Sequence, residues 1–128
     1  MIKIAFLQLL PSECVEENME KGIHYCKEAR KLGADIALFP EMWSCGYHIP
    51  HDLKKLNELA IPTDGEFVTC YAELAKEFDM AIGITFLERR KSRPRNTICL
   101  YDHYGKSVYK YTKVHICNFG EADDESVL

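Results

Sequence analysis

The segment ALFPEMWSCGY, residues 37–47, places a carboxylate directly after an apolar run. Leu38 and Phe39 are typical of a buried strand, whereas Pro40 has no backbone N–H to give to a sheet and Glu41 carries a charge that is costly to bury. The carboxyl ends of strands are where α/β sheets usually place their sites. We therefore interpret Glu41 as a residue placed for chemistry. The alternative is a carboxylate that caps a helix or closes a turn.

A carboxylate in this place is suited to activating a thiol. A free thiol has a pKa of about 8.5, so a cysteine nucleophile gains from a nearby base or cation at neutral pH. Attack on an amide or a nitrile then puts negative charge on the former carbonyl oxygen or nitrile nitrogen. A fixed ammonium group near that atom stabilises the charge by roughly 3–4 kcal/mol, which is the value of one oxyanion-hole donor.

The loop that follows Glu41 is rich in aromatic, thiol and imidazole side chains. We predict that Trp43 and Tyr47 line a substrate pocket beside the carboxylate; the alternative is that they only pack the loop. Cys45, His48 and His51 make a zinc site conceivable. Their spacing is not that of a standard ligand pair, and we predict no metal.

The rest of the chain predicts alternating strands and helices. Strands are expected over residues 2–9, 35–40 and 80–88, and two further strands are joined by a hairpin turn at Tyr104–Gly105. Helices are expected over residues 14–32 and 52–60, and a third has its inner face marked by Phe67, Tyr71, Leu74, Ala75 and Phe78. RRKSRPR, residues 89–95, is expected to be a solvated loop.

This order of elements indicates an α/β fold in which the two long helices cover one face of a sheet. The predicted strands are apolar on both faces, and such strands need cover on both sides. The second face therefore needs a partner, which is a missing half of the domain, a second subunit or both.

Composition limits the function classes. The chain has 128 residues, 47% hydrophobic and 28% charged, so we expect one domain at most. A net charge of −4 gives no basic footprint for nucleic acid or an anionic membrane. No apolar run approaches the ~20 residues of a membrane span, and the start is too short for a secretory signal. The six cysteines contain no C-x-x-C pair, so we expect reduced thiols and a cytoplasmic location.

Several of these segments together resemble the nitrilase superfamily of carbon–nitrogen hydrolases. FPE ends the second strand, YTKVH follows the hairpin, and Glu121 lies a short distance beyond. The segments IKIAFLQL, GADIALFPEM, PTDGEF and NTICLYDHYGK also fit. The likeness spans essentially the whole chain, and the combination is far more specific than any one tripeptide.

The resemblance implies roles for three residues. The family uses a Glu-Lys-Cys triad, in which Glu41 would be the general base and Lys113 would hold the oxyanion. Glu121 would position the substrate. The matching cysteine should lie at the end of a later strand, and none of the six cysteines occupies that position, so we expect this chain alone to be inactive. A truncated product, an excerpt and one half of a split enzyme all remain open.

Each of these site residues also has an alternative interpretation. Lys113 alone is typical of a solvated lysine at a strand end, and Glu121 lies in the acidic run GEADDE, which is typical of a solvated tail. We interpret His115 as a structural hydrogen-bonding residue behind Lys113. Cys45 and Cys117 are candidates for a substitute nucleophile.

The resemblance therefore predicts one incomplete carbon–nitrogen hydrolase domain over residues 1–128, forming half of an α-β-β-α sandwich with a mixed sheet and its helices on one face. The implied activity is hydrolysis of a small amide, an N-carbamoyl compound or a nitrile through a thioester, without a cofactor. Members pair into dimers, so we expect a homodimer. The alternative is a non-catalytic binding or assembly module that retains the fold.

Overall fold

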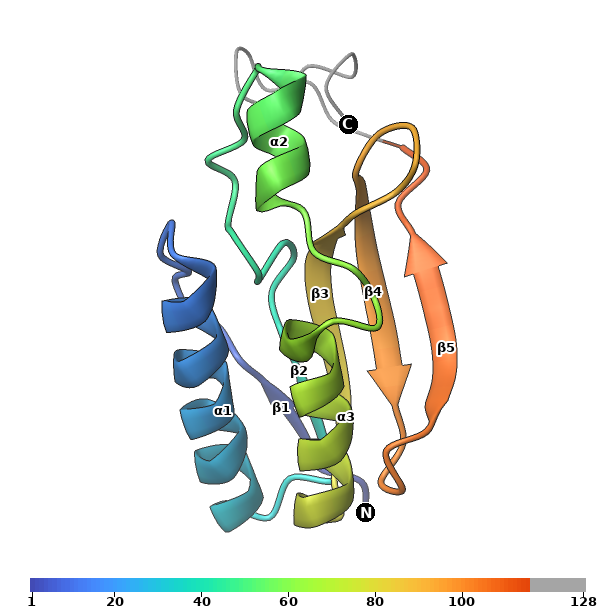
Figure 1. The fold of residues 1–128 in the computed structure, drawn as a ribbon. Coiled ribbons are helices and arrows are strands. Elements are labelled where there is room, and N and C mark those ends of the chain that lie inside the picture. Colours follow the sequence, from blue (N-terminus) through green and yellow to red (C-terminus); the bar gives the residue numbers. More distant parts are fainter. Residues whose placement is uncertain (116–128) are drawn as a thin grey trace.

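The computed structural model describes residues 1–115, which form one sheet with helices packed against it (Figure 1). In chain order the elements are β1 (Ile4–Phe6), α1 (Val15–Lys31), β2 (Ile36–Leu38), α2 (Leu53–Leu59), α3 (Glu66–Phe78), β3 (Ala81–Glu88), β4 (Arg95–Tyr101) and β5 (Ser107–Thr112).

The sheet is mixed, as predicted. Its strand order is β1-β2-β3-β4-β5, with β1, β2 and β3 parallel and the β3–β4 and β4–β5 pairs antiparallel. The long helices α1 and α3 lie side by side over one face (Figure 1). Between them and the sheet lies a core whose most buried members include Trp43, Tyr71, Ile82, Ile84 and Phe86.

Close packing of α1 on α3 depends on a glycine. A Cβ built on Gly22 would lie 2.1 Å from the hydroxyl oxygen of Tyr71, so no larger residue fits there without rearrangement. The same hydroxyl donates a hydrogen bond of 2.9 Å to the carbonyl of Met19. This contact fixes α3 against α1 beneath the loop that follows β2.

The opposite face of the sheet is apolar, and within the described residues its edge strands β1 and β5 are exposed. The strand register puts Phe6, Leu38, Gly83, Leu100 and Tyr109 in one row across this face. Phe6 is 68% exposed and Tyr109 is 55% exposed. The prediction that both long helices cover one face only is therefore confirmed.

Within residues 1–115, no helix has both the length and the apolar character needed to cross a membrane. The five cysteines in the same range, at positions 14, 26, 45, 70 and 99, are free thiols.

Candidate active site

Glu41 lies on a loop that β3 holds in place. The Thr85 hydroxyl donates to the carbonyl of Pro40 and accepts a hydrogen bond of 3.1 Å from the backbone N–H of Trp43. Between these two points the chain turns through Met42, which has a φ of 58° and is fully buried. Glu41 therefore lies shortly after the carboxyl end of β2, on a loop that β3 holds through Thr85.

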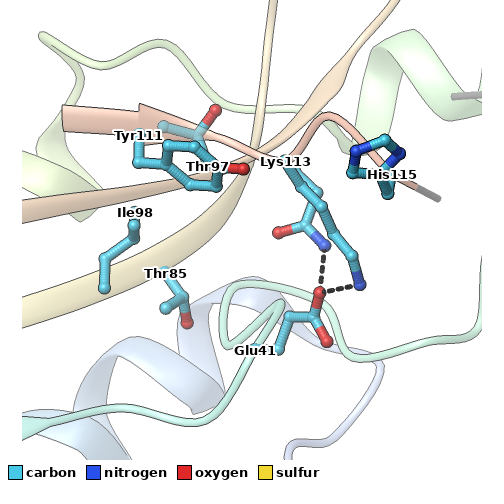
Figure 2. A pocket seen from close by; sticks show the side chains of 8 residues that line it. Glu41, Thr85, Thr97, Ile98, Tyr111, Lys113 and His115 are labelled. Carbon is cyan, nitrogen blue, oxygen red and sulfur yellow. Dashed lines mark hydrogen bonds and ion pairs between the residues drawn. The ribbon is translucent and has the colours of Figure 1, made fainter.

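Two segments that are distant in the chain converge on the Glu41 carboxylate. Its Oε1 atom lies 2.6 Å from Nζ of Lys113 and accepts a hydrogen bond of 2.7 Å from Nδ2 of Asn96 (Figure 2). Asn96 is on β4, and Lys113 follows β5. The backbone N–H of Lys113 donates to the carbonyl of Asn96 at 2.8 Å, which keeps these two residues side by side.

These contacts keep Glu41 ionised. Burial raises the pKa of the carboxyl, but hydrogen bonds from Lys113, Tyr47 and Asn96 and the charge of Lys113 outweigh it, so the pKa lies below its usual range. At neutral pH the group is therefore a carboxylate that can accept a proton.

The Glu41–Lys113 pair borders a cavity of about 470 Å³, which is large enough for a small molecule. In Figure 2, Thr85 and Ile98 lie to one side of Glu41 and His115 lies beside Lys113. The complete lining is Glu41, Thr85, Asn96, Thr97, Ile98, Tyr111, Lys113 and His115. In the same view Lys113 and His115 lie beyond Glu41, and Ile98 and Tyr111 lie on the opposite side of the cavity (Figure 2).

Tyr47 borders a second cavity, of about 440 Å³, that also reaches Glu41. Leu10, Pro11 and His48 contribute to its walls. Tyr47 is 41% exposed and hydrogen-bonds the Glu41 carboxylate. The structure therefore places Tyr47 next to the candidate base, and its part in binding a substrate stays a prediction.

Trp43 is not part of either cavity wall, and the sequence prediction needs correction here. Its side chain is fully buried, packs at 5.3 Å between ring centroids against Phe39, and donates through Nε1 to the carbonyl of Asn18 at 3.1 Å. Because the loop folds the indole under itself, Trp43 is a core residue. This is the packing alternative considered above.

We expect Trp43→Phe to lower the free energy of unfolding by about 2 kcal/mol, because it removes buried ring atoms and leaves the Asn18 carbonyl without its donor. The measurement is urea unfolding. Tyr104→Phe, at an exposed aromatic position, should change the same quantity by less than about 0.5 kcal/mol. A Trp43→Phe variant of unchanged stability would contradict the core assignment.

The other predicted ligands and nucleophiles are placed as follows. Cys45 is buried, its thiol points to the carbonyl of Gly46 at 3.4 Å, and burial raises the pKa of the thiol to about 11, which argues against a nucleophilic role. No group of three His, Cys, Asp or Glu side chains within residues 1–115 is arranged to hold a metal ion. Glu121 and Cys117 lie outside the described residues.

Asn96 is a site residue that sequence reasoning passed over. It begins the strand segment NTICLY, but its contact with Glu41 depends on which face of β4 it occupies. Its neighbour Thr97 bonds to a different carboxylate, that of Glu88. The local sequence gives no signal for this contact, because the contact depends on the pairing of β4 with β5.

We expect Asn96→Ala to raise the pKa of Glu41, because one of the hydrogen bonds to the ionised form is lost. A lowered carboxyl pKa in the folded state adds stability above the pKa of the unfolded chain, and this stability disappears as the pH falls through the folded-state pKa. The variant should therefore lose less stability than the parent on acidification below pH ~4.5. Carboxyl ¹³C NMR titration and urea unfolding measure the two effects; Asn57→Ala, on α2, is the control.

Comparison with known proteins relates this chain to one family of hydrolases. The sequence model of a family described as carbon–nitrogen hydrolase matches residues 3–127. Citrullinase of Francisella tularensis is 32% identical over 116 residues, which cover 90% of this chain and 41% of the citrullinase. N-carbamoylputrescine amidase of Oryza sativa is 26% identical over 116 residues, covering 90% of this chain and 38% of the amidase. The chain thus spans about two fifths of the length of these relatives.

The fold has solved counterparts. A carbon–nitrogen hydrolase from Helicobacter pylori superimposes with a TM-score of 0.80 at 19% identity, over 94% of this chain and 42% of that one. At this level of identity the match concerns the fold, and it agrees with the mixed sheet described above.

Proposed function

Since the chain belongs to the carbon–nitrogen hydrolase family, we propose that it supplies the base and the oxyanion-stabilising cation of an enzyme that cleaves non-peptide C–N bonds. The substrate is a small amide, an N-carbamoyl compound or a nitrile. The observation that carries the proposal is the 2.6 Å ion pair between Glu41 and Lys113 at a cavity of suitable size. Glu121 keeps its predicted role in positioning the substrate.

The proposed reaction on an amide has two stages. Glu41 takes the proton of a cysteine thiol, and the sulfur attacks the carbonyl carbon while the C=O electron pair moves to oxygen. Lys113 stabilises this oxyanion. As the carbonyl re-forms, the C–N bond breaks and nitrogen leaves with the proton from Glu41. Water, activated by Glu41, then hydrolyses the thioester and regenerates the thiol.

The arrangement of the Glu41–Lys113 pair supports Glu41 as the base and Lys113 as the cation that stabilises the oxyanion. The Nζ atom of Lys113 lies 2.6 Å from Glu41 at the edge of the cavity, so its positive charge is close to the place where an oxyanion would form. The lowered pKa of Glu41 keeps the base deprotonated before substrate arrives.

The described residues do not supply the cysteine nucleophile that the proposed reaction needs. None of the five described cysteines lines the cavity. Burial also raises the pKa of Cys26 and Cys70 to about 12. We place the nucleophile in a part of the whole protein beyond this chain, which would then be inactive alone. Cys117 is the alternative.

The exposed apolar face supports a related proposal about assembly. Residues 1–128 would form one incomplete domain, completed by the rest of the whole protein, and a homodimer would follow. The chemistry proposed for Glu41 and Lys113 needs no cofactor. The cytoplasmic location stays a prediction.

The test is an assay of the full-length protein on N-carbamoyl amines, short amides and nitriles. Release of ammonia or amine shows turnover, and N-carbamoyl amines come first because one relative is named N-carbamoylputrescine amidase. We expect turnover of at least one class, abolished by thiol alkylation. A folded full-length protein that turns over no class would favour the non-catalytic binding module.

A further inference from the structure

A second carboxylate, Glu88, lies buried behind the candidate site. It ends β3, and only 4% of its surface is exposed. The strand register puts Glu88 on the same face as Thr97 and Thr112, which form a cross-strand pair on β4 and β5. Asn96 and Lys113 are the next residues along these strands, and their side chains reach Glu41 on the other face.

The Glu88 carboxylate joins three strands. Its Oε1 atom accepts from Nζ of Lys110 at 2.7 Å and from Nε of Arg90 at 3.2 Å. Its Oε2 atom accepts from Nη2 of Arg90 and from the hydroxyl of Thr97, both at 3.1 Å. The same Arg90 nitrogen donates to the Thr112 hydroxyl at 2.7 Å. Both oxygens of a buried charge are therefore satisfied.

This network bonds to the chain neighbours of Asn96 and Lys113, two of the donors to Glu41. Thr97 directly follows Asn96, and Thr112 directly precedes Lys113. The 2.8 Å backbone hydrogen bond from Lys113 to Asn96 completes the connection between the two strands. A shift of β5 relative to β4 would therefore move Lys113 relative to Asn96 and Glu41.

We propose that Glu88 is a positioning residue: by tying Arg90, Lys110, Thr97 and Thr112 together, it sets the distance from Lys113 and Asn96 to Glu41. The catalytic meaning of this inference rests on the proposed function. The geometric claim is independent of it and is tested without an activity assay, so the two can fail separately.

The test is the pKa of Glu41, measured by carboxyl ¹³C NMR in the full-length protein carrying Glu88→Gln. The amide keeps the shape but cannot accept hydrogen bonds on both atoms, so β5 should loosen and the pKa of Glu41 should rise. We expect a rise of about half a pH unit or more, because an opposite charge within ~4–6 Å lowers a carboxyl pKa by about 1–3 units. The direct effect of deleting a negative charge has the opposite sign, which separates the two explanations.

Thr112→Val is the second variant, because it removes the link to Arg90 without changing any charge. It should also raise the pKa of Glu41, and it decides the question if Glu88→Gln does not fold. Val68→Ala, in the core at α3, is the control for general destabilisation and should leave the pKa unchanged. An unchanged or lowered pKa of Glu41 in a folded Glu88→Gln or Thr112→Val variant would overturn the proposal.

Discussion

Glu41→Gln is expected to lower kcat/KM of the full-length enzyme by about 10²–10⁴, the range over which general acid–base groups contribute. The amide keeps the size of the side chain and its place between Asn96 and Lys113, but it cannot take the proton of a thiol. Because the pKa of Glu41 is lowered, the acidic limb of the parent's pH profile should lie below the usual range of a glutamate. The variant should lose this limb.

The matched control is Glu58→Gln, which removes an exposed carboxylate on α2. It should leave both the rate and the acidic limb unchanged. A Glu41→Gln enzyme within tenfold of the parent, with the same pH profile, would show that Glu41 is a structural carboxylate.

Lys113→Met is expected to lower kcat by about 10²–10³ with a smaller change in KM, because the ammonium is assigned to charge that develops in the transition state. The same change should raise the pKa of Glu41, since the hydrogen bond and charge of Lys113 lower it. Lys113→Arg should restore little activity, because a planar guanidinium presents its donors differently from an ammonium.

Stability separates this catalytic role from a structural one. The side chains of Lys113 and Glu41 are 31% and 43% exposed, and ion pairs of this exposure contribute at most about 1 kcal/mol to folding. Thermal unfolding of Lys113→Met should therefore resemble that of Lys106→Met, a change at an exposed lysine in the β4–β5 turn. A large loss of stability with a proportionate loss of activity would contradict the assignment.

The helices and the longer strands could be predicted from residue periodicity. A helix expected over residues 14–32 is observed over Val15–Lys31, and the strand expected over 80–88 is observed over Ala81–Glu88. The predicted turn is present, with Gly105 at a φ of 79°. These features depend on local spacing and on conformations that glycine alone adopts easily.

The ends of strands are harder to predict, because a strand extends only as far as the neighbouring strand pairs with it. Residues 2–9 are apolar enough for a long strand, but β1 covers only Ile4–Phe6, since its partner β2 is Ile36–Leu38. The loop at 89–95 was expected to be solvated, yet Arg90 bonds to the buried Glu88. Neither the length of β1 nor the contact between Arg90 and Glu88 can be predicted from the local sequence.

The meeting of Glu41 and Lys113 could be anticipated, because the family resemblance assigns them adjoining roles and each follows the end of a strand. The positions of Asn96 and Trp43 in the structure could not be predicted from the sequence. Asn96 reaches Glu41 because of the β4–β5 register, and Trp43 is buried because the loop turns at Met42. Both outcomes depend on tertiary geometry that residue types do not encode.

The most direct measurement is intact-protein mass spectrometry of the full-length enzyme, quenched in acid during turnover of a substrate identified in the panel. The proposed mechanism predicts an acyl group on one cysteine in the parent and its absence, or formation slowed at least a hundredfold, in Glu41→Gln. A cysteine adduct that forms equally fast without the Glu41 carboxylate, or turnover by the parent in which no adduct forms on any thiol, would contradict it.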